Sequence, residues 1–356
     1  MRILVTGGAG FIGSAVIRHI INNTEHSVIN VDALTYAGNL ESLKEVEDNN
    51  RYTFVRANVS NIVTMQVIFD RYKPESIIHL AAESHVDRSI DNSIAFINTN
   101  ILGTYTLLEC ARKYYNNADE DIKDKFKFLH VSTDEVYGSL GDEGLFTEET
   151  PYDPRSPYSA SKASSDHLVM AWYHTYGLPT VITNCSNNYG PYQFPEKLIP
   201  LVLLNAMEEK ELPIYGKGDN IRDWLYVEDH AYALLLALKK GKPGEKYNIG
   251  GMNERTNLKI VKTICKCLDE IKPRKNGKKY EELIVFVKDR PAHDRRYAID
   301  ATKIRTQLGW KPNFSFNRGL NETIKWYINN EWWWKPIRET NYNGQRLGEI
   351  KIDSND

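Results

Sequence analysis

The chain has few cysteines, no long hydrophobic run and almost no net charge, and each shortage excludes a class of protein. Among its 356 residues are four cysteines, Cys110, Cys185, Cys265 and Cys267, which form neither a CxxC pair nor a zinc-binding spacing. No stretch approaches the roughly 18 apolar residues of a membrane span, and the apolar run at the N-terminus is broken by glycines, unlike a signal peptide. Lys and Arg total 45 against 47 for Asp and Glu, so no basic excess indicates a nucleic-acid partner. We therefore expect a cytoplasmic protein with no metal site, no nucleic-acid partner and no membrane partner.

The first half of the chain alternates short β-rich runs with helical segments. Apolar runs of strand length occur at residues 2–6, 27–32, 52–56, 76–80, 126–132 and 180–185, and helical periodicity occurs at 10–23, 62–72, 94–115 and 159–176. This alternation predicts an α/β fold of the Rossmann type, in which a doubly wound parallel sheet carries helices on both faces. Shorter elements after about residue 186 predict a smaller C-terminal domain that binds the substrate.

These patterns also predict the domain limits. We expect a cofactor-binding domain over residues 1–185, with residues 222–240 packing back on it, a substrate-binding domain over 186–336, and a polar tail over 337–356. Three consecutive tryptophans at 332–334 are expected in the core or in an interface rather than in a ligand cage.

A glycine-rich loop follows the first strand. Residues 8–13 fit G-x-G-x-x-G, and Gly7, Gly10 and Gly13 also fit a wider G-x-x-G-x-x-G spacing. Glycine permits the tight turn, lets the backbone approach a pyrophosphate, and brings the helix close to the strand. The helix N-terminus that follows offers free N–H groups to phosphates. Because this loop joins a strand to a helix at the start of a βαβ unit, it predicts a dinucleotide site.

Asp32 stands at the end of the second predicted strand. A carboxylate there accepts hydrogen bonds from both ribose hydroxyls and repels a 2′-phosphate, which favours NAD over NADP. The alternative is a residue that only ends a strand.

Tyr158 and Lys162 are four residues apart in a predicted helix and therefore share one face. A nearby ammonium stabilises a phenolate, so we expect the pKa of Tyr158 to lie below its ordinary value of about 10. Such a tyrosine takes a proton from an alcohol while a hydride leaves for nicotinamide. The alternative is an exposed surface pair.

A hydroxyl and two carboxylates follow the fifth predicted strand, at Thr133, Asp134 and Glu135. Ligands of an open parallel sheet bind at the carboxyl ends of its strands. Two neighbouring acids can divide into an acid and a base when their surroundings separate their pKa values. The alternative is a solvated turn.

These motifs together resemble the extended short-chain dehydrogenase/reductase family, and within it the nucleotide-sugar 4,6-dehydratases. The resemblance extends from Met1 to about Pro336. Further matches lie at residues 81–87, 187–191, 222–224 and 289–294, and the Thr-Asp-Glu triplet separates the dehydratases from related epimerases.

The resemblance implies dehydration of dTDP-glucose to dTDP-4-keto-6-deoxyglucose, with NAD as a retained hydride carrier and no net redox change. Tyr158, supported by Lys162, deprotonates the 4-hydroxyl, and Thr133 bonds the C4 oxygen. Glu135 removes the C5 proton, and Asp134 protonates the departing C6 hydroxyl. The resemblance also implies that the product is used in deoxysugar biosynthesis, for example of rhamnose.

The resemblance also implies contacts. Those to NAD are expected from Gly7, Gly10, Phe11, Ile12, Gly13, Asp32, Ala33, Leu34, Thr35, Asn58, Val59, Leu80, Ala81, Ala82, Ser84, Thr99, Tyr158, Lys162 and Asn188. Those to the substrate are expected from Ser84, Thr133, Asn187, Lys197, Leu198, Pro213, Tyr215, Arg222, Asn257, Asp289, Arg290 and His293. A homodimer is expected through a helix pair at residues 94–115 and 159–176.

Two positions depart from the family pattern. Asn58 stands where an aspartate usually meets the adenine, which predicts a weaker contact without charge. Ala292 replaces a glycine and adds a methyl group near the expected nucleotide site. Two other functions remain as alternatives: a nucleotide-sugar epimerase or decarboxylase, which does not need the acid pair, and a non-catalytic NAD-binding protein on the same fold.

Overall fold

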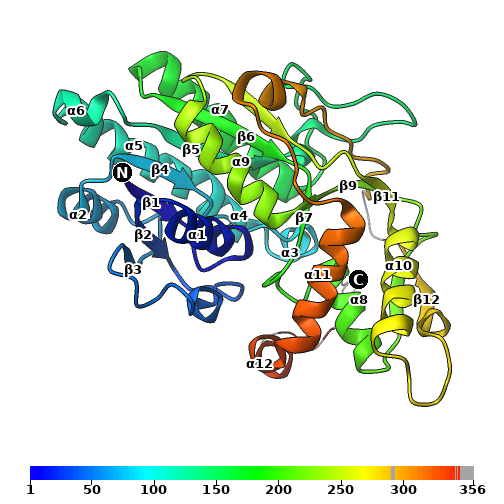
Figure 1. Ribbon diagram of the computed structural model, residues 1–356. Helices are drawn as coiled ribbons and strands as arrows, with labels where there is room; N and C mark the ends of the chain where they lie inside the picture. Colours follow the sequence, from blue (N-terminus) through cyan, green and yellow to red (C-terminus); the bar gives the residue numbers. More distant parts are fainter. Residues whose placement is uncertain (290–292, 341, 343, 345–356) are drawn as a thin grey trace, which may run out of the picture.

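A seven-stranded parallel sheet forms the centre of the larger part of the molecule (Figure 1). The computed structural model describes residues 1–289, 293–340, 342 and 344. The strand order is β10-β6-β5-β4-β1-β2-β3. The strands are β1 (Arg2–Thr6), β2 (Ser27–Asp32), β3 (Tyr52–Arg56), β4 (Ser76–His79), β5 (Phe128–Thr133), β6 (Thr180–Cys185) and β10 (Lys246–Ile249). The chain order reverses between β1 and β4, where an open α/β sheet binds its ligands.

Helices cover both faces of this sheet because successive strand residues point to opposite sides. In β1, Ile3 and Val5 belong to a buried cluster with α1 (Phe11–Asn23) and α9 (Val227–Lys240), which pack against each other. Leu4, between them, belongs to a second cluster on the other face. The helices of that face are α2 (Ile62–Tyr72), α5 (Gly103–Asn116) and α7 (Pro157–Tyr176). The expected Rossmann-type α/β fold is confirmed.

The C-terminal part has two small sheets and its own core. One sheet has the order β11-β9-β7 and the other pairs β12 with β8. Their strands are β7 (Asn187–Tyr189), β8 (Leu212–Tyr215), β9 (Ile221–Tyr226), β11 (Glu254–Thr256) and β12 (Ile284–Val287). The helices are α8 (Leu198–Met207), α10 (Asn257–Ile271), α11 (Phe316–Asn329) and α12 (Glu331–Thr340). A large buried cluster rich in aromatic side chains joins these elements.

Short helical segments connect the main elements. They are η1 (Leu40–Leu43), α3 (Val86–Asp91), α4 (Ser93–Phe96), η2 (Ile97–Leu102), α6 (Glu120–Lys123), η3 (Asp134–Tyr137), η4 (Tyr280–Leu283) and η5 (Ile304–Leu308). The helix expected over residues 94–115 runs without a gap through α4, η2 and α5, and its middle part, η2, is π-helical. β10, which no pattern indicated, adds to the sheet edge beside β6.

The segment expected as a polar tail begins inside a helix. Residues 337–340 form the end of α12, where Ile337 is buried and Arg338 donates to Asn205 Oδ1 at 2.9 Å and to Glu208 Oε2 at 2.8 Å. Apart from Tyr342 and Gly344, the rest of the tail lies outside the described residues.

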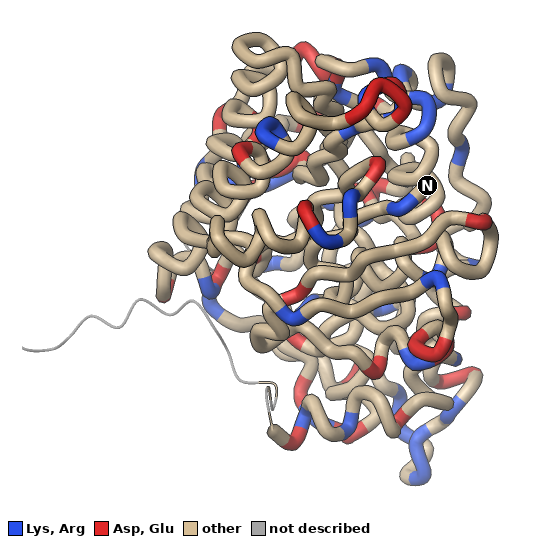
Figure 2. The backbone as a smooth tube through the Cα atoms, turned by 90° about the vertical axis from the view of Figure 1, so that its left-hand side faces the viewer, with Lys and Arg blue, Asp and Glu red and all other residues tan. Residues whose placement is uncertain are grey.

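Charged residues of both signs are spread over the chain without long blocks of one sign, and Figure 2 shows them interspersed along the tube. Among the described residues, no helix is both long and apolar enough to cross a membrane.

Candidate active site

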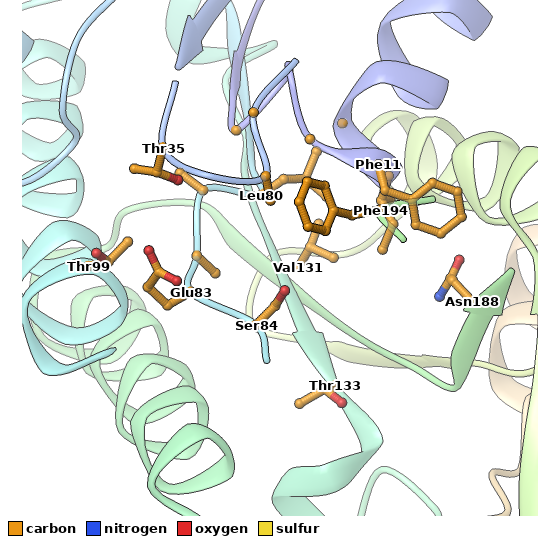
Figure 3. Close-up of a pocket in the computed structure, with 18 of the residues that line it drawn as sticks. Phe11, Thr35, Leu80, Glu83, Ser84, Thr99, Val131, Thr133, Asn188 and Phe194 are labelled. Atoms are coloured by element: carbon orange, nitrogen blue, oxygen red, sulfur yellow. The ribbon is translucent and has the colours of Figure 1, made fainter. Parts of the chain in front are cut away.

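A cavity of about 320 Å³ lies at the carboxyl ends of the central strands. The loops after β1, β2, β4, β5 and β6 all contribute to its wall. Figure 3 shows Phe11, Leu80, Ser84 and Thr133 around this space, with Asn188 and Phe194 facing it from the C-terminal side.

The glycine loop forms one wall of the cavity. Gly7 has a φ of +71°, and a Cβ there would lie 2.7 Å from the Ala81 nitrogen, so the turn requires glycine. At Gly10 an added Cβ would meet only the Gly7 oxygen, at 3.2 Å, and would otherwise point into open space. The missing side chain of Gly10 thus leaves room beside the N-terminus of α1, where a pyrophosphate fits.

Asp32 is held at the end of β2 by two backbone donors. The N–H of Ala9 donates to Oδ2 at 2.9 Å, and the N–H of Leu34 donates to Oδ1 at 2.8 Å. Burial raises the pKa of Asp32, although both hydrogen bonds oppose the rise. Each carboxylate oxygen has two lone pairs, so Asp32 still has an acceptor for each of two ribose hydroxyls.

The Thr133–Asp134–Glu135 triplet lies where β5 passes into η3. Thr133 Oγ1 accepts from the Glu135 N–H at 3.2 Å and donates to Asp134 Oδ1 at 3.3 Å, and all three residues line the cavity. Asp134 is only 2% exposed. Burial raises the pKa of Asp134 well above its ordinary range, and the negative charges of Glu135 and Asp223 act in the same direction. Asp134 is therefore suited to carry a proton, while the less buried Glu135 is better placed to accept one.

Tyr158 and Lys162 lie on α7 and both line the cavity. Lys162 Nζ donates to the Val131 carbonyl at 2.9 Å and lies 3.4 Å from His130 Nε2. The structure does not support the expected lowering of the Tyr158 pKa. Burial raises the pKa of Tyr158 well above its ordinary value, and the negative charge of Glu135 adds to the rise, while a hydrogen bond with Thr133 opposes it. Helical spacing predicted the pair but could not show that an acid faces the phenol.

The cavity brings together nearly all the residues that were expected to hold NAD. Only Leu34 is missing from its lining, and it contributes the backbone N–H that orients Asp32. Asn58 lines the cavity, but its Oδ1 already accepts from the N–H and the hydroxyl of Ser60, at 3.0 and 2.8 Å.

The expected substrate residues are divided between two places. Ser84, Thr133, Asn187 and Lys197 line the cavity, and Lys197 Nζ donates to the Ser84 carbonyl at 3.0 Å. The remaining described members do not line it: Leu198, Pro213, Tyr215, Arg222, Asn257, Asp289 and His293. Arg290 and Ala292 lie outside the described residues.

Part of this second set forms its own group near β8. His293 Nδ1 lies 2.6 Å from Asp289 Oδ1, and the rings of His293 and Tyr215 are 6.4 Å apart. Arg222 instead donates to the Ile221 carbonyl at 2.8 Å and to the Asp294 carbonyl at 2.9 Å. Its positive charge lowers the pKa of Asp134, so Arg222 also influences the acid pair.

Several lining residues were missed by the sequence motifs. Glu83 lies within the matched segment 81–87, whereas Cys185, Phe194 and Glu196 line the cavity without belonging to any expected set. Cys185 is the last residue of β6, and its position at the carboxyl end of a strand could have indicated it. Phe194 and Glu196 come from the C-terminal part, and no local pattern places them here.

The residues present fit a dinucleotide. The open side of Gly10, the helix N-terminus and the oriented Asp32 carboxylate line one cavity. At the catalytic end, the buried Asp134 Oδ2 and Asn187 Oδ1 have no hydrogen-bond partner among the described residues, so both polar atoms remain available to a ligand.

Fold and site together define a class: a dinucleotide-binding Rossmann protein with a tyrosine–lysine pair and a second part that adjoins the site. The chain belongs to the GDP-mannose 4,6 dehydratase family, whose model matches residues 4–323. A dTDP-glucose 4,6-dehydratase of Escherichia coli is 61% identical over 362 residues, covering 99% of this chain and 100% of the relative.

Solved structures give the same result. The dTDP-glucose 4,6-dehydratase of Bacillus anthracis in complex with NAD is 48% identical, with a TM-score of 0.84 over 95% of this chain and 99% of that chain. The enzyme of the same name from Streptomyces venezuelae, with NAD and dTDP bound, is 42% identical, with a TM-score of 0.87 over 95% and 100%. The predicted resemblance to the nucleotide-sugar 4,6-dehydratases is confirmed.

Proposed function

We propose that this protein catalyses the NAD-dependent dehydration of dTDP-glucose to dTDP-4-keto-6-deoxyglucose, a hydro-lyase reaction. The observation that carries the proposal is the acid pair. Asp134 and Glu135 share one cavity with Tyr158 and Lys162, and of the two acids only Asp134 is fully buried. An epimerase has no use for a second acid and base beside its tyrosine, and a protein that only binds NAD needs none of the four. Similarity to proteins named for this reaction supports the same conclusion.

The proposed roles of Asp134 and Glu135 follow from their surroundings, and those of Tyr158, Lys162 and Thr133 follow from the family resemblance. Tyr158 takes the proton of the sugar 4-hydroxyl, and Thr133 bonds the C4 oxygen. Because burial and the charge of Glu135 oppose ionisation of Tyr158, we assign Lys162, on the same face of α7, the role of supplying the compensating positive charge. NAD, when bound, would supply the hydride acceptor for C4 and the hydride donor for C6. Oxidation at C4 acidifies the C5 proton, which Glu135 removes and which is replaced at C5 when the hydride reaches C6. Asp134, whose burial keeps it protonated, gives its proton to the departing C6 hydroxyl.

The placement of the ligands is also proposed. Residues 1–185 and 222–240 would hold the cofactor, with the NAD-contact residues expected above. Residues 186–336 would hold the nucleotide, with Lys197 beside the diphosphate and the group around Tyr215 and His293 farther along. Lysine and arginine are suited to phosphate oxygens. Cytoplasmic function is consistent with four cysteines that are all free.

The direct test incubates the purified protein with dTDP-glucose and follows the product by mass. Loss of one water supports the proposal, and inversion at C4 without loss of water contradicts it. Glu135→Gln should stall after C4 oxidation, with bound cofactor accumulating in its reduced form by absorbance. Glu143→Gln, an exposed acid outside the cavity, is the matched control and should turn over normally.

We also propose a homodimer. Large apolar side chains are exposed along α4, η2, α5 and α7: Ile94, Ile97, Leu102, Tyr105 and Tyr176, each at least 40% exposed. Exposed apolar side chains that gather on neighbouring helices are typical of protein–protein interfaces. Light scattering during gel filtration should give twice the chain mass. Ile97→Glu should give monomers, whereas Val63→Glu, at an exposed position on α2, should not.

A further inference from the structure

Asp166 continues the face of α7 that carries the tyrosine and the lysine. Tyr158, Lys162 and Asp166 follow one another at intervals of four residues, so they lie above one another on the helix. Asp166 does not line the cavity and is 1% exposed. A carboxylate in such surroundings is costly unless hydrogen bonds and an opposite charge compensate it.

Four side chains surround this carboxylate. Ser132 Oγ donates to Oδ2 at 2.8 Å, Tyr152 OH at 2.9 Å and Asn184 Nδ2 at 3.3 Å. His130 Nε2 lies 3.2 Å from Oδ1. Asn184 Nδ2 also donates to the Thr133 carbonyl at 3.1 Å. Asp166 therefore connects α7 to the ends of β5 and β6, next to the start of the Thr133–Glu135 triplet.

His130 lies between Asp166 and Lys162. Its Nε2 is 3.2 Å from Asp166 Oδ1 and 3.4 Å from Lys162 Nζ, while its Nδ1 has no hydrogen-bond partner among the described residues. His130 Nε2 thus faces both the carboxylate and the ammonium, and the tautomer with its proton on Nε2 is the one that can donate to Asp166. Burial holds the pKa of His130 at about 4, so the ring is neutral near pH 7.

With His130 neutral, two charged groups remain in this cluster: the Lys162 ammonium and the Asp166 carboxylate. Lys162 is 4% exposed, and burial lowers its pKa while the charge of Asp166 opposes that change. Burial acts to raise the pKa of Asp166, but His130, the charge of Lys162 and the hydrogen bond from Ser132 together outweigh it, so the pKa is lowered. Without the carboxylate, the ammonium would be a buried cation with no opposite charge on its own helix.

We propose that Asp166 is a positioning residue that keeps Lys162 in its ammonium form and fixes the strand end that carries the acid pair. The proposal rests on the function proposed above, because it assigns Asp166 to the tyrosine–lysine half of that reaction. Other titratable groups also face this region from neighbouring elements. They are His79 on β4, His130 on β5, Asp134, Glu135 and Tyr137 on η3, Tyr152 in the preceding loop, Tyr158 on α7 and Cys185 on β6.

The test is the pH profile of kcat for dehydration in the holoenzyme. Asp166→Asn keeps the shape and the acceptor oxygen but removes the charge, so Lys162 should lose its proton at lower pH. The alkaline limb of the profile should move down by about 1 pH unit. Tyr152→Phe removes one hydrogen bond to Asp166 and keeps its charge, so the limb should stay in place.

Repeating the measurement in a Lys162→Arg variant distinguishes an effect of the Asp166 charge on Lys162 from a structural effect of the substitution. Arginine stays protonated over the whole range, so Asp166→Asn should move no limb when combined with Lys162→Arg. An equal shift in both backgrounds, or none in either, overturns the proposal. Wild-type protein that makes product in the same series keeps the proposed function intact whatever Asp166 does.

A further measurement does not need a folded Asp166→Asn. The Cε resonance of Lys162 in wild-type holoenzyme, assigned by its loss in Lys162→Arg, reports the protonation of the amine. An ammonium at about pH 8 supports the proposal, and a neutral amine there overturns it.

Discussion

Arg88 and Glu196 are 108 residues apart in the chain, and Arg88 Nε donates to Glu196 Oε2 at 2.9 Å. Tyr36 OH donates to the other carboxylate oxygen, also at 2.9 Å, and the guanidinium lies 3.9 Å from the centre of the Tyr36 ring. Three segments thus meet beside the cavity: the loop after β2, helix α3, and the residues before α8. Because Glu196 lines the cavity, this contact joins the C-terminal part to the cofactor-binding loops.

The first prediction concerns retention of the cofactor. Arg88→Met leaves the Glu196 side chain, which is 1% exposed, without its guanidinium, and the three segments should separate more easily. We expect NAD to bind roughly tenfold more weakly in equilibrium dialysis, a loss of about 1.4 kcal/mol. Arg155→Met removes an exposed ion pair with Asp153 and is the control. Equal affinity in the two variants would show that the contact does not hold the cofactor.

The second prediction concerns the choice of cofactor. Asp32→Ala removes the carboxylate that Ala9 and Leu34 orient, so NAD should bind about tenfold or more weakly and the preference over NADP should shrink. Asp48→Ala, at an exposed position after η1, is the control. Calorimetric titration with both dinucleotides measures the two affinities. An unchanged ratio would remove Asp32 from the cofactor site.

Features formed by residues close together in the chain were predicted from the sequence, whereas features formed by remote segments were not. The glycine loop, Asp32 and the Tyr158–Lys162 pair are local patterns, and the cavity contains all of them. Glu196 reaches the site only because two remote segments fold beside it, so no motif marks it. β10 is four residues long and is recognisable as a strand only through its pairing with β6.

Electrostatic surroundings were harder to predict than positions. The four-residue spacing in α7 predicted a lowered pKa for Tyr158, whereas burial and the charge of Glu135 raise it. Both causes depend on how η3 packs against α7, which spacing along one helix does not contain. The different surroundings of Asp134 and Glu135 also depend on how η3 packs. The sequence allowed for this difference, because adjacent residues at a strand end seldom share one environment.

The third prediction is a gain in stability with loss of activity. The folded pKa of Asp134 lies well above its unfolded value, so its contribution to stability is present at low pH and is lost as pH rises through the folded pKa. At neutral pH, Asp134 therefore lowers the free energy of unfolding, because its carboxylate ionises more readily in the unfolded chain than in the folded one. Asp134→Asn cannot ionise and should raise the free energy of unfolding by roughly 1 kcal/mol, or about 2 °C in Tm, while dehydration is abolished.

The pH dependence of this gain identifies its cause. The difference in Tm between Asp134→Asn and wild type should vanish below about pH 4, where both unfolded chains are uncharged at this position. Asp124→Asn, at an exposed position after α6, should change Tm little at any pH. A gain that persists at low pH would arise from packing instead of ionisation.

The last prediction concerns acid unfolding. His230 on α9 is fully buried; its Nδ1 lies 2.9 Å from Asn188 Oδ1, and burial lowers its pKa to about 3. Unfolding restores the ordinary value of 6.5, so between pH 6.5 and about 3 the unfolded state binds the extra proton. Stability from this group is complete above pH 6.5 and falls by about 1.4 kcal/mol per pH unit within that window.

His230→Gln keeps a donor for Asn188 but cannot take up the proton, so proton uptake on unfolding near pH 5 should fall by about one. His174→Gln, exposed in the last turn of α7, should leave this uptake nearly unchanged. Denaturant unfolding measured across the pH range gives the uptake from its slope, and equal slopes for His230→Gln and wild type would mean that the buried ring is not the acid-sensitive group.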